Sequence, residues 1–445
     1  MSDLNALKNS KGTKLYRKAK KLIPGGTQLL SKRPEMFAPG QWPAYYKTAK
    51  GVTIVDMDDN TYTDMCYMGI GSCTLGYADE DVNLKVINTI NNASMTTLST
   101  SMELELAELL IDIHPWAECV KYARSGGEAM SIAIRLARAA TGKDKVLFCG
   151  YHGWHDWYLS SNLGNGDALG SWHLLPGLDP LGIPKGLMGT SIPFEYNNTQ
   201  KFKKLIDEHD GEIGVVVLET VRNIIPDPAF FAEIRKSCDE KNIVFILDEI
   251  TSGFRMNAGG AHLLYDIEPD VAVFAKTISN GFPMAAIVGK RNVMENAEKT
   301  FVSSLNWTES VGPAAALATI HKMQNNDIFS HTTRLGKMVQ ELWLKAASDN
   351  NLEISISGPI PQLSLFSFDH DNASAIKTLY VQEMLERGYL TTTAFYPSWA
   401  HNEDHINSFE KDVNLVFSKI SNILQEGDLS SSLKGEICHS GFNRL

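Results

Sequence analysis

Residues 243–255 read IVFILDEITSGFR and residues 271–276 read VAVFAK, and these two segments decide how the chain folds. Each segment opens with a short, continuous apolar run, which is typical of a strand buried in a parallel sheet. Asp248 and Lys276 follow those runs, so we expect both polar side chains at the carboxyl edge of one sheet. Ligands bind at that edge in α/β folds. The two residues are therefore the first candidates for a functional site.

An amine beside a carboxylate suits an aldehyde cofactor that contains a pyridine ring. The amine holds the aldehyde covalently, and the carboxylate keeps the ring nitrogen protonated, because the protonated ring is the electron sink for a carbanion. In the other reading, Asp248 is a helix N-cap and Lys276 is a surface residue. A lysine directly after a buried strand faces a desolvation cost, which favours the neutral amine that imine formation requires.

Composition and charge exclude several classes of protein. The chain has 445 residues, 43% hydrophobic and 21% charged, which suits a large domain plus a smaller one. The net charge is −11 and the only basic cluster, residues 18–21, is typical of a solvated helix face, so no nucleic-acid partner is predicted. The six cysteines lack zinc-type spacing and no apolar signal region is present, so we expect a cytoplasmic protein with reduced thiols. No apolar stretch approaches the roughly 20 residues that cross a bilayer, so no membrane location is expected.

Apolar strand runs alternate with helical periods through the middle of the chain, at residues 145–149, 213–218, 243–247, 271–275 and 285–288. This alternation predicts crossover units on a mostly parallel sheet. We therefore predict an α/β fold with a large domain over residues 76–325. A smaller α+β domain is expected to combine the N-terminal segment 1–75 with the C-terminal segment 326–445.

The terminal segments predict simpler elements. A helix over residues 5–22 is expected to end at Pro24-Gly25-Gly26, followed by antiparallel strands within residues 45–62. After residue 326, helices are predicted at 328–349, 373–387 and 407–425, around a half-buried strand at 362–368. The polar residues from Gly427 onward predict a flexible tail.

A Gly-Gly pair marks the start of a predicted helix, in Ser125-Gly126-Gly127-Glu128-Ala129. Backbone N–H groups at a helix start form a cradle for phosphate. Taken alone, capping of the helix by Ser125 is the simpler explanation.

The loop after the strand at 145–149 reads GYHGWHD, residues 150–156, and brings an aromatic ring and two imidazoles to the same sheet edge. Tyr151 could stack on a planar cofactor ring, or it could pack beneath the loop with Trp154 and Trp157. His152 and His155 lie three residues apart, but no third ligand is evident, and no metal site is predicted.

Glu219 ends another apolar run, and Arg222 follows it within a turn. A carboxylate at this position could orient a substrate or balance a cation. A structural ion pair between Glu219 and Arg222 explains the residues equally well.

These segments, in this order, resemble the class III, or subgroup II, pyridoxal-phosphate aminotransferases, and most closely their glutamate-1-semialdehyde aminotransferase-like branch. The resemblance covers nearly the whole chain and implies the transferase fold of type I. Its carriers are Pro24-Gly25-Gly26, the Ser125–Ala129 motif, Tyr151-His152-Gly153, residues 247–255 and Lys276 with residues 280–283.

The resemblance also implies a cofactor, pyridoxal 5'-phosphate, and a role for each residue that holds it. Gly126 and Gly127 would contact the phosphate, with Ser125 beside them. Tyr151 would stack on the ring, Asp248 would pair with the pyridine nitrogen, and Lys276 would form the Schiff base. His152 and Glu219 are further residues of the implied cofactor site.

Thr308, within residues 307–313 (WTESVGP), matches the family threonine that reaches the phosphate of the neighbouring subunit. The resemblance therefore implies a homodimer with Thr308 contributed across the interface. A role for Thr308 in the core or as a cap is the other reading.

The substrate that the resemblance implies is a carbonyl sugar acid. The aminomutase of this branch usually has Thr or Ser where Gly127 stands, Gly-Asn-Pro at residues 311–313, and a loop shorter than residues 163–187. The chain looks more similar to the branch members that make amino sugars for surface polysaccharides. They would move an amino group from L-glutamate to an aldehyde or keto sugar acid and yield 8-amino-3,8-dideoxy-octulosonate for lipopolysaccharide. Aminomutase activity in tetrapyrrole synthesis is the alternative.

Arginine is the expected partner for a substrate carboxylate, because its planar fork pairs bidentately. Arg33, Arg222 and Arg255 are the candidates, although each could form a structural ion pair. A noncatalytic scaffold, a cofactor-binding regulator and a nucleotide-binding loop are the other readings. The Lys276 and Asp248 pair disfavours the first two, and the missing Gly-x-Gly-x-x-Gly pattern disfavours the third.

Overall fold

The computed structural model describes residues 10–164, 178–221 and 224–441. The chain divides into two compact units, of which unit 1 combines Met1–Asp79 with Asp327–Leu445 and unit 2 is Glu80–Asn326. The sequence prediction had placed the corresponding boundaries after residues 75 and 325.

Unit 2 is built on a seven-stranded sheet. Its strands, in spatial order, are β4 (Cys119–Ala123), β10 (Ala285–Gly289), β9 (Val271–Phe274), β8 (Val244–Asp248), β7 (Ile213–Glu219), β5 (Lys145–Cys149) and β6 (Ser191–Pro193). The pairs from β9 to β6 are parallel, whereas β10 runs antiparallel to both β9 and β4. The prediction of a mostly parallel sheet is confirmed. The short connection between β9 and β10 explains the reversal, because parallel neighbours need a longer crossover.

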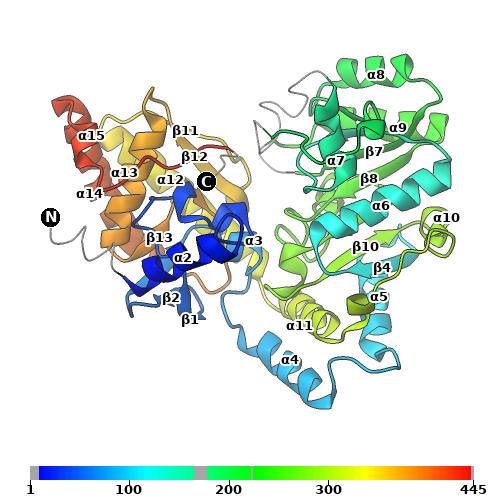
Figure 1. Ribbon diagram of the computed structural model, residues 1–445, viewed down its shortest axis with the longest axis horizontal. Helices are drawn as coiled ribbons and strands as arrows, with labels where there is room; N and C mark the ends of the chain where they lie inside the picture. Colours follow the sequence, from blue (N-terminus) through cyan, green and yellow to red (C-terminus); the bar gives the residue numbers. More distant parts are fainter. Residues whose placement is uncertain (1–9, 165–177, 222–223, 442–445) are drawn as a thin grey trace. The chain divides into compact units, whose positions relative to one another are not determined.

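Both faces of this sheet are covered, which is why its strands have continuous apolar runs. Val215 and Val217 of β7 pack into one hydrophobic core, and Val216 and Leu218 pack into the other. Figure 1 shows α6 lying across the strands on one face. The helices of unit 2 are α4 (Glu80–Asn92), α5 (Ser101–Ile113), α6 (Gly126–Thr141), α7 (Asp156–Leu159), α8 (Thr199–Glu208), α9 (Pro228–Lys241), α10 (Arg291–Met294) and α11 (Val311–Asn325).

The central strands end at the same level. Glu219 of β7 lies opposite Asp248 of β8, and Asp248 lies opposite Val273 of β9. Lys276 follows three residues after Val273, at the start of the short 3-10 helix η6 (Lys276–Ser279). The register therefore brings two carboxylates and an amine to one sheet edge.

Unit 1 contains two small sheets and the C-terminal helices. One sheet has the order β1 (Tyr46–Lys50), β2 (Thr53–Asp56), β3 (Thr61–Met65) and β13 (Tyr389–Thr391), and the other has β11 (Ile354–Ile356), β12 (Ser364–Phe368) and β14 (Ala394–Phe395). The helices are α2 (Lys11–Leu22), α3 (Met68–Gly71), α12 (Ile328–Asp349), α13 (Ala373–Glu386), α14 (Glu403–Glu426) and α15 (Leu429–Ser432). β13 runs parallel to β3, which joins the two ends of the chain in one sheet.

The expectation of a flexible tail after Gly427 is wrong for the described residues. Helix α15 follows, the Lys434 N–H donates to Gln382 Oε1 at 2.8 Å, and the Cys438 N–H donates to Thr378 Oγ1 at 2.9 Å. Cys438 is buried. Polar composition was misleading here because the backbone N–H groups find acceptors on α13.

A buried polar network lies beneath the sheet edge, with Glu249 at its centre. Glu249 is fully buried and accepts hydrogen bonds from Thr220 Oγ1 at 2.8 Å and Ser252 Oγ at 2.5 Å. His262 Nδ1 lies 2.8 Å from the same carboxylate. Burial alone would raise the pKa of Glu249, but the hydrogen bonds from His262 and Ser252 outweigh it and leave that pKa below its ordinary value.

Two histidines extend the network. Trp116 Nε1 donates to His262 Nε2 at 3.0 Å. The Gly260 N–H donates to His114 Nε2 at 2.9 Å, while His114 Nδ1 lies 2.8 Å from the Leu110 carbonyl oxygen. His114 Nε2 must be unprotonated to accept, so the proton of this ring lies on Nδ1. Burial, with His262 close by, lowers the pKa of His114 to about 4.

The low pKa of His114 predicts that the protein loses stability in acid. Its folded-state pKa of about 4 lies below the ordinary value of 6.5, so the unfolded chain binds more protons between these values. The free energy of unfolding should therefore fall as the pH drops from 6.5 to 4, with at most about 3 kcal/mol from this group.

The measurement is denaturant unfolding at several pH values for the unaltered chain and for His114→Gln. The amide can still donate to Leu110 and accept from Gly260, but it does not titrate. The variant should lose less stability over this pH range. Parallel curves for the two proteins would show that His114 does not contribute to the acid sensitivity.

Candidate active site

Lys276 begins η6 in an unusual backbone conformation. Its φ is +41°, in the left-handed region that residues with a side chain rarely adopt. Such strain persists only where the surrounding structure enforces it, and it is concentrated at functional sites. The Nζ atom donates to Thr251 Oγ1 at 2.9 Å, and the side chain is partly buried. The amine is therefore held at the sheet edge, so the reading of Lys276 as an ordinary surface residue is wrong.

Asp248 is buried at the end of β8 and pairs with His152. Asp248 Oδ2 lies 2.8 Å from His152 Nδ1, and Oδ1 accepts from the Ile250 N–H at 3.0 Å. Asp248 is not the N-cap of an α-helix, because β8 is followed by turns. The carboxylate is thus fixed by the backbone on one side and by an imidazole on the other.

The protonation of this pair follows from the partners of His152. Its Nε2 atom lies 3.0 Å from the carbonyl oxygen of Cys149, which only accepts, so Nε2 carries a proton. The proton between Nδ1 and Asp248 belongs either to the ring or to the carboxyl. Burial raises the pKa of Asp248, Glu219 raises it further, and the hydrogen bond and charge of His152 oppose the rise. A cation close to Asp248 would favour the ionised carboxylate.

Glu219 and Tyr151 meet through the backbone. Glu219 is buried, and its Oε2 accepts from the Tyr151 N–H at 3.2 Å. A Cβ at Gly150 would lie 2.6 Å from Glu219 Oε2, so only glycine leaves room for this approach. Gly150 also has a φ of +106°. The predicted partner Arg222 lies outside the described residues.

The aromatic residues of the loop differ in their surroundings. Tyr151 is partly buried, and its ring lies edge-on to Tyr158 with centroids 5.9 Å apart. Trp157 is buried in the core, as one reading had expected, but Trp154 is 71% exposed. Trp157 therefore packs beneath the loop, whereas Trp154 does not.

The Ser125-Gly126-Gly127 segment leads into α6, with Ser125 at the N-cap position. Ser125 makes no side-chain capping hydrogen bond, so the reading of this motif as simple capping by Ser125 is wrong. The first N–H groups of a helix have no intrahelical acceptor, and they attract anions. A Cβ at Gly126 would lie 2.8 Å from Ile250 Cδ1, so a side chain there would crowd the loop that holds Asp248.

Thr308 ends the 3-10 helix η8 (Leu305–Thr308) and is exposed. Its hydroxyl donates to the Leu305 carbonyl oxygen at 2.8 Å. The structure therefore gives no support for a role of Thr308 in the core.

The three candidate arginines have different surroundings. Arg255 is 2% exposed, and its Nε donates to the Thr251 carbonyl oxygen at 2.8 Å. Arg33 belongs to unit 1, after the 3-10 helix η1 (Leu30–Lys32). Arg222 is outside the described residues. The buried Arg255 supports the segment that carries Thr251, the partner of Lys276.

Two residues of this region were not found from the sequence. Thr251 is recognised only from its contact with Lys276, although its position three residues after Asp248 was a signal. Arg124 directly precedes Ser125, the first residue of the Ser125–Ala129 motif, and its guanidinium contacts Glu309. A basic residue beside a cradle for an anion was the available signal.

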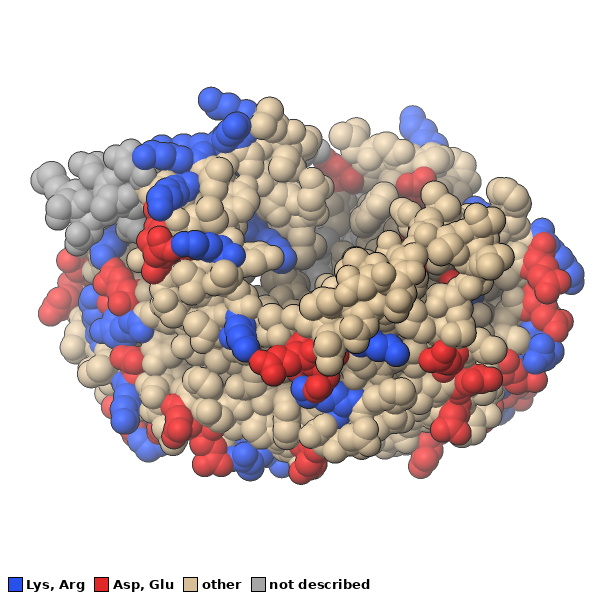
Figure 2. Space-filling view, turned by 90° about the horizontal axis from the view of Figure 1, so that it is seen from below, with Lys and Arg blue, Asp and Glu red and all other residues tan. Residues whose placement is uncertain are grey.

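The surface and the side-chain clusters bear on the expected partners and metal sites. On the face shown in Figure 2, acidic and basic side chains are interspersed. Within the described ranges, no helix has the length and apolarity needed to span a membrane. His152 and His155 are not part of any group of three or more metal-ligating side chains found among the described residues.

The residues present fit pyridoxal phosphate. The amine of Lys276 and the carboxylate of Asp248, which pairs with His152, lie at one sheet edge. The start of α6, which has no side-chain cap, lies beside them, because Gly126 packs closely against Ile250 of the loop after Asp248. These are the three groups that the aldehyde, the ring nitrogen and the phosphate need.

Known proteins similar to this chain match it over most of its length. Three relatives are 3-aminobutyryl-CoA aminotransferase of Cloacimonas acidaminovorans, glutamate-1-semialdehyde 2,1-aminomutase of Clostridium botulinum and 2'-deamino-2'-hydroxyneamine transaminase of Streptomyces kanamyceticus. The first is 30% identical and the alignment covers 84% of this chain and 87% of the relative. The second is 32% identical, and its alignment covers 89% of this chain and 96% of the relative. The third is also 32% identical, and its alignment covers 75% of this chain and 80% of the relative.

Solved structures have the same fold. The internal aldimine form of the FumI protein of Sphingopyxis sp. MTA144 aligns with a TM-score of 0.84 at 23% identity, covering 93% of this chain and 97% of that protein. The family model for class-III aminotransferases matches residues 36–411. The chain therefore belongs to the class-III aminotransferase family and is a pyridoxal-phosphate-dependent aminotransferase with the type I fold.

Proposed function

We propose that this enzyme moves an amino group from L-glutamate to an aldehyde or keto sugar acid, and that Lys276 and Asp248 carry the reaction. The product proposed is 8-amino-3,8-dideoxy-D-manno-octulosonate, for lipopolysaccharide. The observation that carries the proposal is the strained Lys276, whose amine lies at the same sheet edge as the buried Asp248 and His152 pair.

Lys276 has two tasks in this proposal. Its amine would hold the cofactor aldehyde, and once released it would take the proton from the amino-bearing carbon of glutamate. Bound pyridoxal phosphate supplies the electron sink that makes this carbon acidic. Once the amine is released from the cofactor, its hydrogen bond to Thr251 Oγ1, 2.9 Å from Nζ, would keep it at the sheet edge.

Asp248 would accept the hydrogen bond from the ring N–H of the cofactor. His152 supports this task, because a proton on Nδ1 stabilises the ionised carboxylate inside a buried site. Tyr151 would contact the cofactor ring, and Glu219 would fix the Tyr151 backbone. Ser125, Gly126 and Gly127 would cradle the phosphate at the start of α6.

A homodimer would complete the site, with Thr308 reaching the partner's phosphate. Apolar side chains near Thr308 support this, since Phe301 is 90% exposed and Leu305 is 73% exposed. Helix α4 adds a second exposed apolar face, formed by Leu84, Ile87 and Ile90 at helical spacing. The Ser310 N–H donates to the Ser94 carbonyl oxygen at 2.8 Å, which joins the two surfaces.

The choice of a sugar substrate rests on two observations. One relative is named 2'-deamino-2'-hydroxyneamine transaminase. A Cβ at Gly127 would lie 2.9 Å from His155 Cε1, so His155 fills the space that a Thr or Ser side chain would need there. Aminomutase activity is the second candidate. Another relative is named glutamate-1-semialdehyde 2,1-aminomutase, and the alignment with it covers 96% of its length.

The six cysteines support a reducing compartment. All are free thiols in the structure. We therefore place the reaction in the cytoplasm, where reduced thiols persist.

Replacement of Lys276 should abolish turnover. Lys276→Ala is expected to lower kcat at least about a thousandfold, because the same amine holds the cofactor and moves the proton. Steady-state assays measure kcat, and absorption after gel filtration measures noncovalent cofactor uptake, which should persist. Lys290→Ala, which removes a lysine paired with Glu268 at 2.9 Å, is the control and should stay active. An active Lys276→Ala enzyme would refute the assignment.

Replacement of Asp248 should slow proton removal. Asp248→Asn keeps the shape but removes the charge that favours a protonated ring, so the half-reaction with glutamate should slow at least about a hundredfold. Stopped-flow absorbance measures this rate. Asp210→Asn, which alters an exposed acid paired with Lys241, should leave the rate unchanged. Equal rates for the two variants would contradict the proposed role of Asp248.

The proposed function is tested by adding L-glutamate, without any acceptor, to the full-length protein loaded with pyridoxal phosphate. Loss of the yellow absorption band, with formation of pyridoxamine phosphate, is the expected result for an aminotransferase that uses this donor. Restoration of the band by a carbonyl sugar acid would support the acceptor class. A band that glutamate leaves unchanged would favour the aminomutase reading or another donor.

A further inference from the structure

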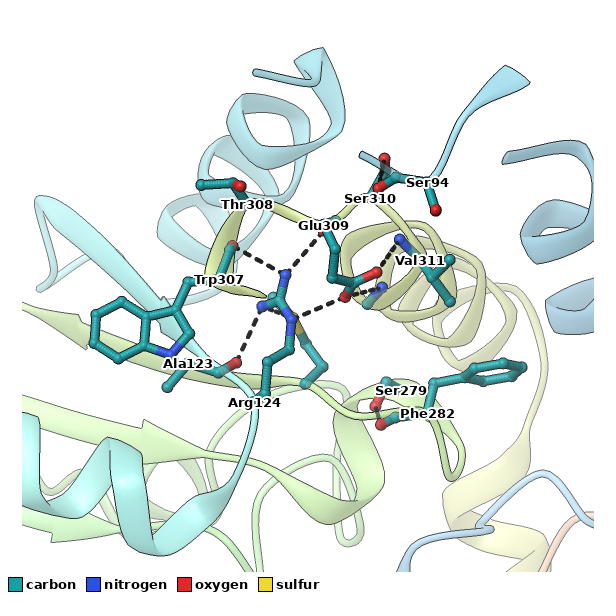
Figure 3. Close-up of polar contacts among 12 residues, drawn as sticks. Ser94, Ala123, Arg124, Ser279, Phe282, Trp307, Thr308, Glu309, Ser310 and Val311 are labelled. Atoms are coloured by element: carbon teal, nitrogen blue, oxygen red, sulfur yellow. Dashed lines mark hydrogen bonds and ion pairs between the residues drawn. The ribbon is translucent and has the colours of Figure 1, made fainter. Parts of the chain in front are cut away.

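Arg124 lies between Ala123, the last residue of β4, and Ser125, the first residue of the phosphate cradle. Its side chain is only 12% exposed. As Figure 3 shows, Nη2 donates to the carbonyl oxygens of Trp307 at 2.9 Å and Glu309 at 2.8 Å. The guanidinium therefore holds the carbonyl groups on both sides of Thr308.

Glu309 connects this loop to α11. Its Oε1 atom lies 2.8 Å from Arg124 Nε, and its carboxylate accepts from the N–H groups of Val311 at 2.7 Å and Gly312 at 2.9 Å. A Cβ at Gly312 would lie 2.8 Å from Glu309 Oε1, so a larger residue would displace the carboxylate. The Arg124–Glu309 ion pair therefore joins the start of α11 to the residue before the cradle.

Glu128 makes a second connection from the other side of the cradle. Its Oε2 accepts from the Arg124 N–H at 2.9 Å, and its Oε1 accepts from Trp307 Nε1 at 3.0 Å. Both residues that flank the Ser125–Gly127 segment thus hold the Trp307–Glu309 loop. A planar guanidinium with several donors can serve such divergent acceptors at once, which a lysine ammonium on a flexible stem does less well.

Thr308 is held by its neighbours and not by its own side chain. In Figure 3 its side chain points away from Arg124, and its hydroxyl donates to Leu305. Arg124 therefore fixes where Thr308 lies relative to the cradle of the same subunit without touching the threonine side chain.

We propose that Arg124 is a positioning residue for the cofactor phosphate, which sets Thr308 at a fixed distance from the Ser125–Gly127 cradle. The proposal rests on the proposed function, in which Thr308 serves the phosphate of the partner subunit. One guanidinium then aligns two groups that contact phosphate. The Ser125–Gly127 cradle binds the phosphate of its own subunit, and Thr308 reaches the phosphate of the partner subunit. Its loss weakens cofactor binding and leaves the chemical step intact.

The test is titration of the full-length protein with pyridoxal phosphate, followed by the visible absorption of the bound cofactor, with kcat measured at saturating cofactor. Arg124→Met should weaken the apparent cofactor affinity roughly tenfold, about the loss of one hydrogen bond to a charged group, and leave kcat within about twofold. Arg124→Lys keeps the ion pair with Glu309 but not both carbonyl contacts. It should recover part of the affinity, and it tests the proposal if the methionine variant fails to fold.

Arg138→Met is the matched control. Arg138 is also a partly buried arginine of unit 2, near the far end of α6, and its Nε donates to the Asp144 carbonyl oxygen at 2.8 Å. Burial lowers the pKa of both guanidinium groups. The control variant should bind the cofactor as the unaltered protein does. An equal loss of affinity in both variants would assign Arg124 a general structural role and overturn the proposal.

A double-mutant cycle with Thr308→Ala shows whether Arg124 acts through Thr308. If it does, Arg124→Met weakens binding much less in the Thr308→Ala background than in the unaltered chain. A full, additive loss in that background overturns the positioning role. The positioning role is also overturned if Thr308→Ala weakens cofactor binding and Arg124→Met does not. In that case the proposed function still stands. If Thr308→Ala itself has no effect, the proposed role of Thr308 in a dimer fails, and the inference fails with it.

Discussion

The parallel register of β7, β8 and β9 is the constraint on which the rest of the site depends. Glu219 lies opposite Asp248, and Asp248 lies opposite Val273, three residues before Lys276. A shift of one residue in a strand would turn the side chains of that strand to the other face. The two hydrophobic cores prevent such a shift, because alternate residues of β7 are already committed to opposite faces.

Placing these charges in the interior is costly, and the structure offsets the cost with fixed partners. Asp248 shares a proton with His152, and Glu249 accepts from Thr220, Ser252 and His262. A buried carboxylate without such partners would become protonated. The two neighbouring carboxylates therefore have different environments. Burial raises the pKa of Asp248, whereas hydrogen bonds hold the pKa of Glu249 below its ordinary value.

The loops that complete the site are joined by side chains to the sheet. Thr251 meets the amine of Lys276, and Arg255 holds the Thr251 backbone. Arg124 and Glu128 hold the loop that carries Thr308. Loops have little packing of their own, so such contacts set their geometry. Precise placement of the groups that bind a cofactor depends on this support.

The sequence alone determined the class of fold, the helices of the C-terminal segment and the positions of Lys276, Asp248 and the Gly-Gly motif. Those features follow from local patterns, such as continuous apolar runs and a glycine pair before a helix, which need no knowledge of distant residues. Only the tertiary structure decided that β10 runs antiparallel, that the residues after Gly427 pack on α13, that His152 pairs with Asp248, and that Thr251 and Arg124 contact the site. Each of these depends on partners far away in the chain, such as Asp248 for His152 and Glu309 for Arg124. A hydrogen bond between such residues exists only after the chain has folded, and no periodicity of the sequence encodes it.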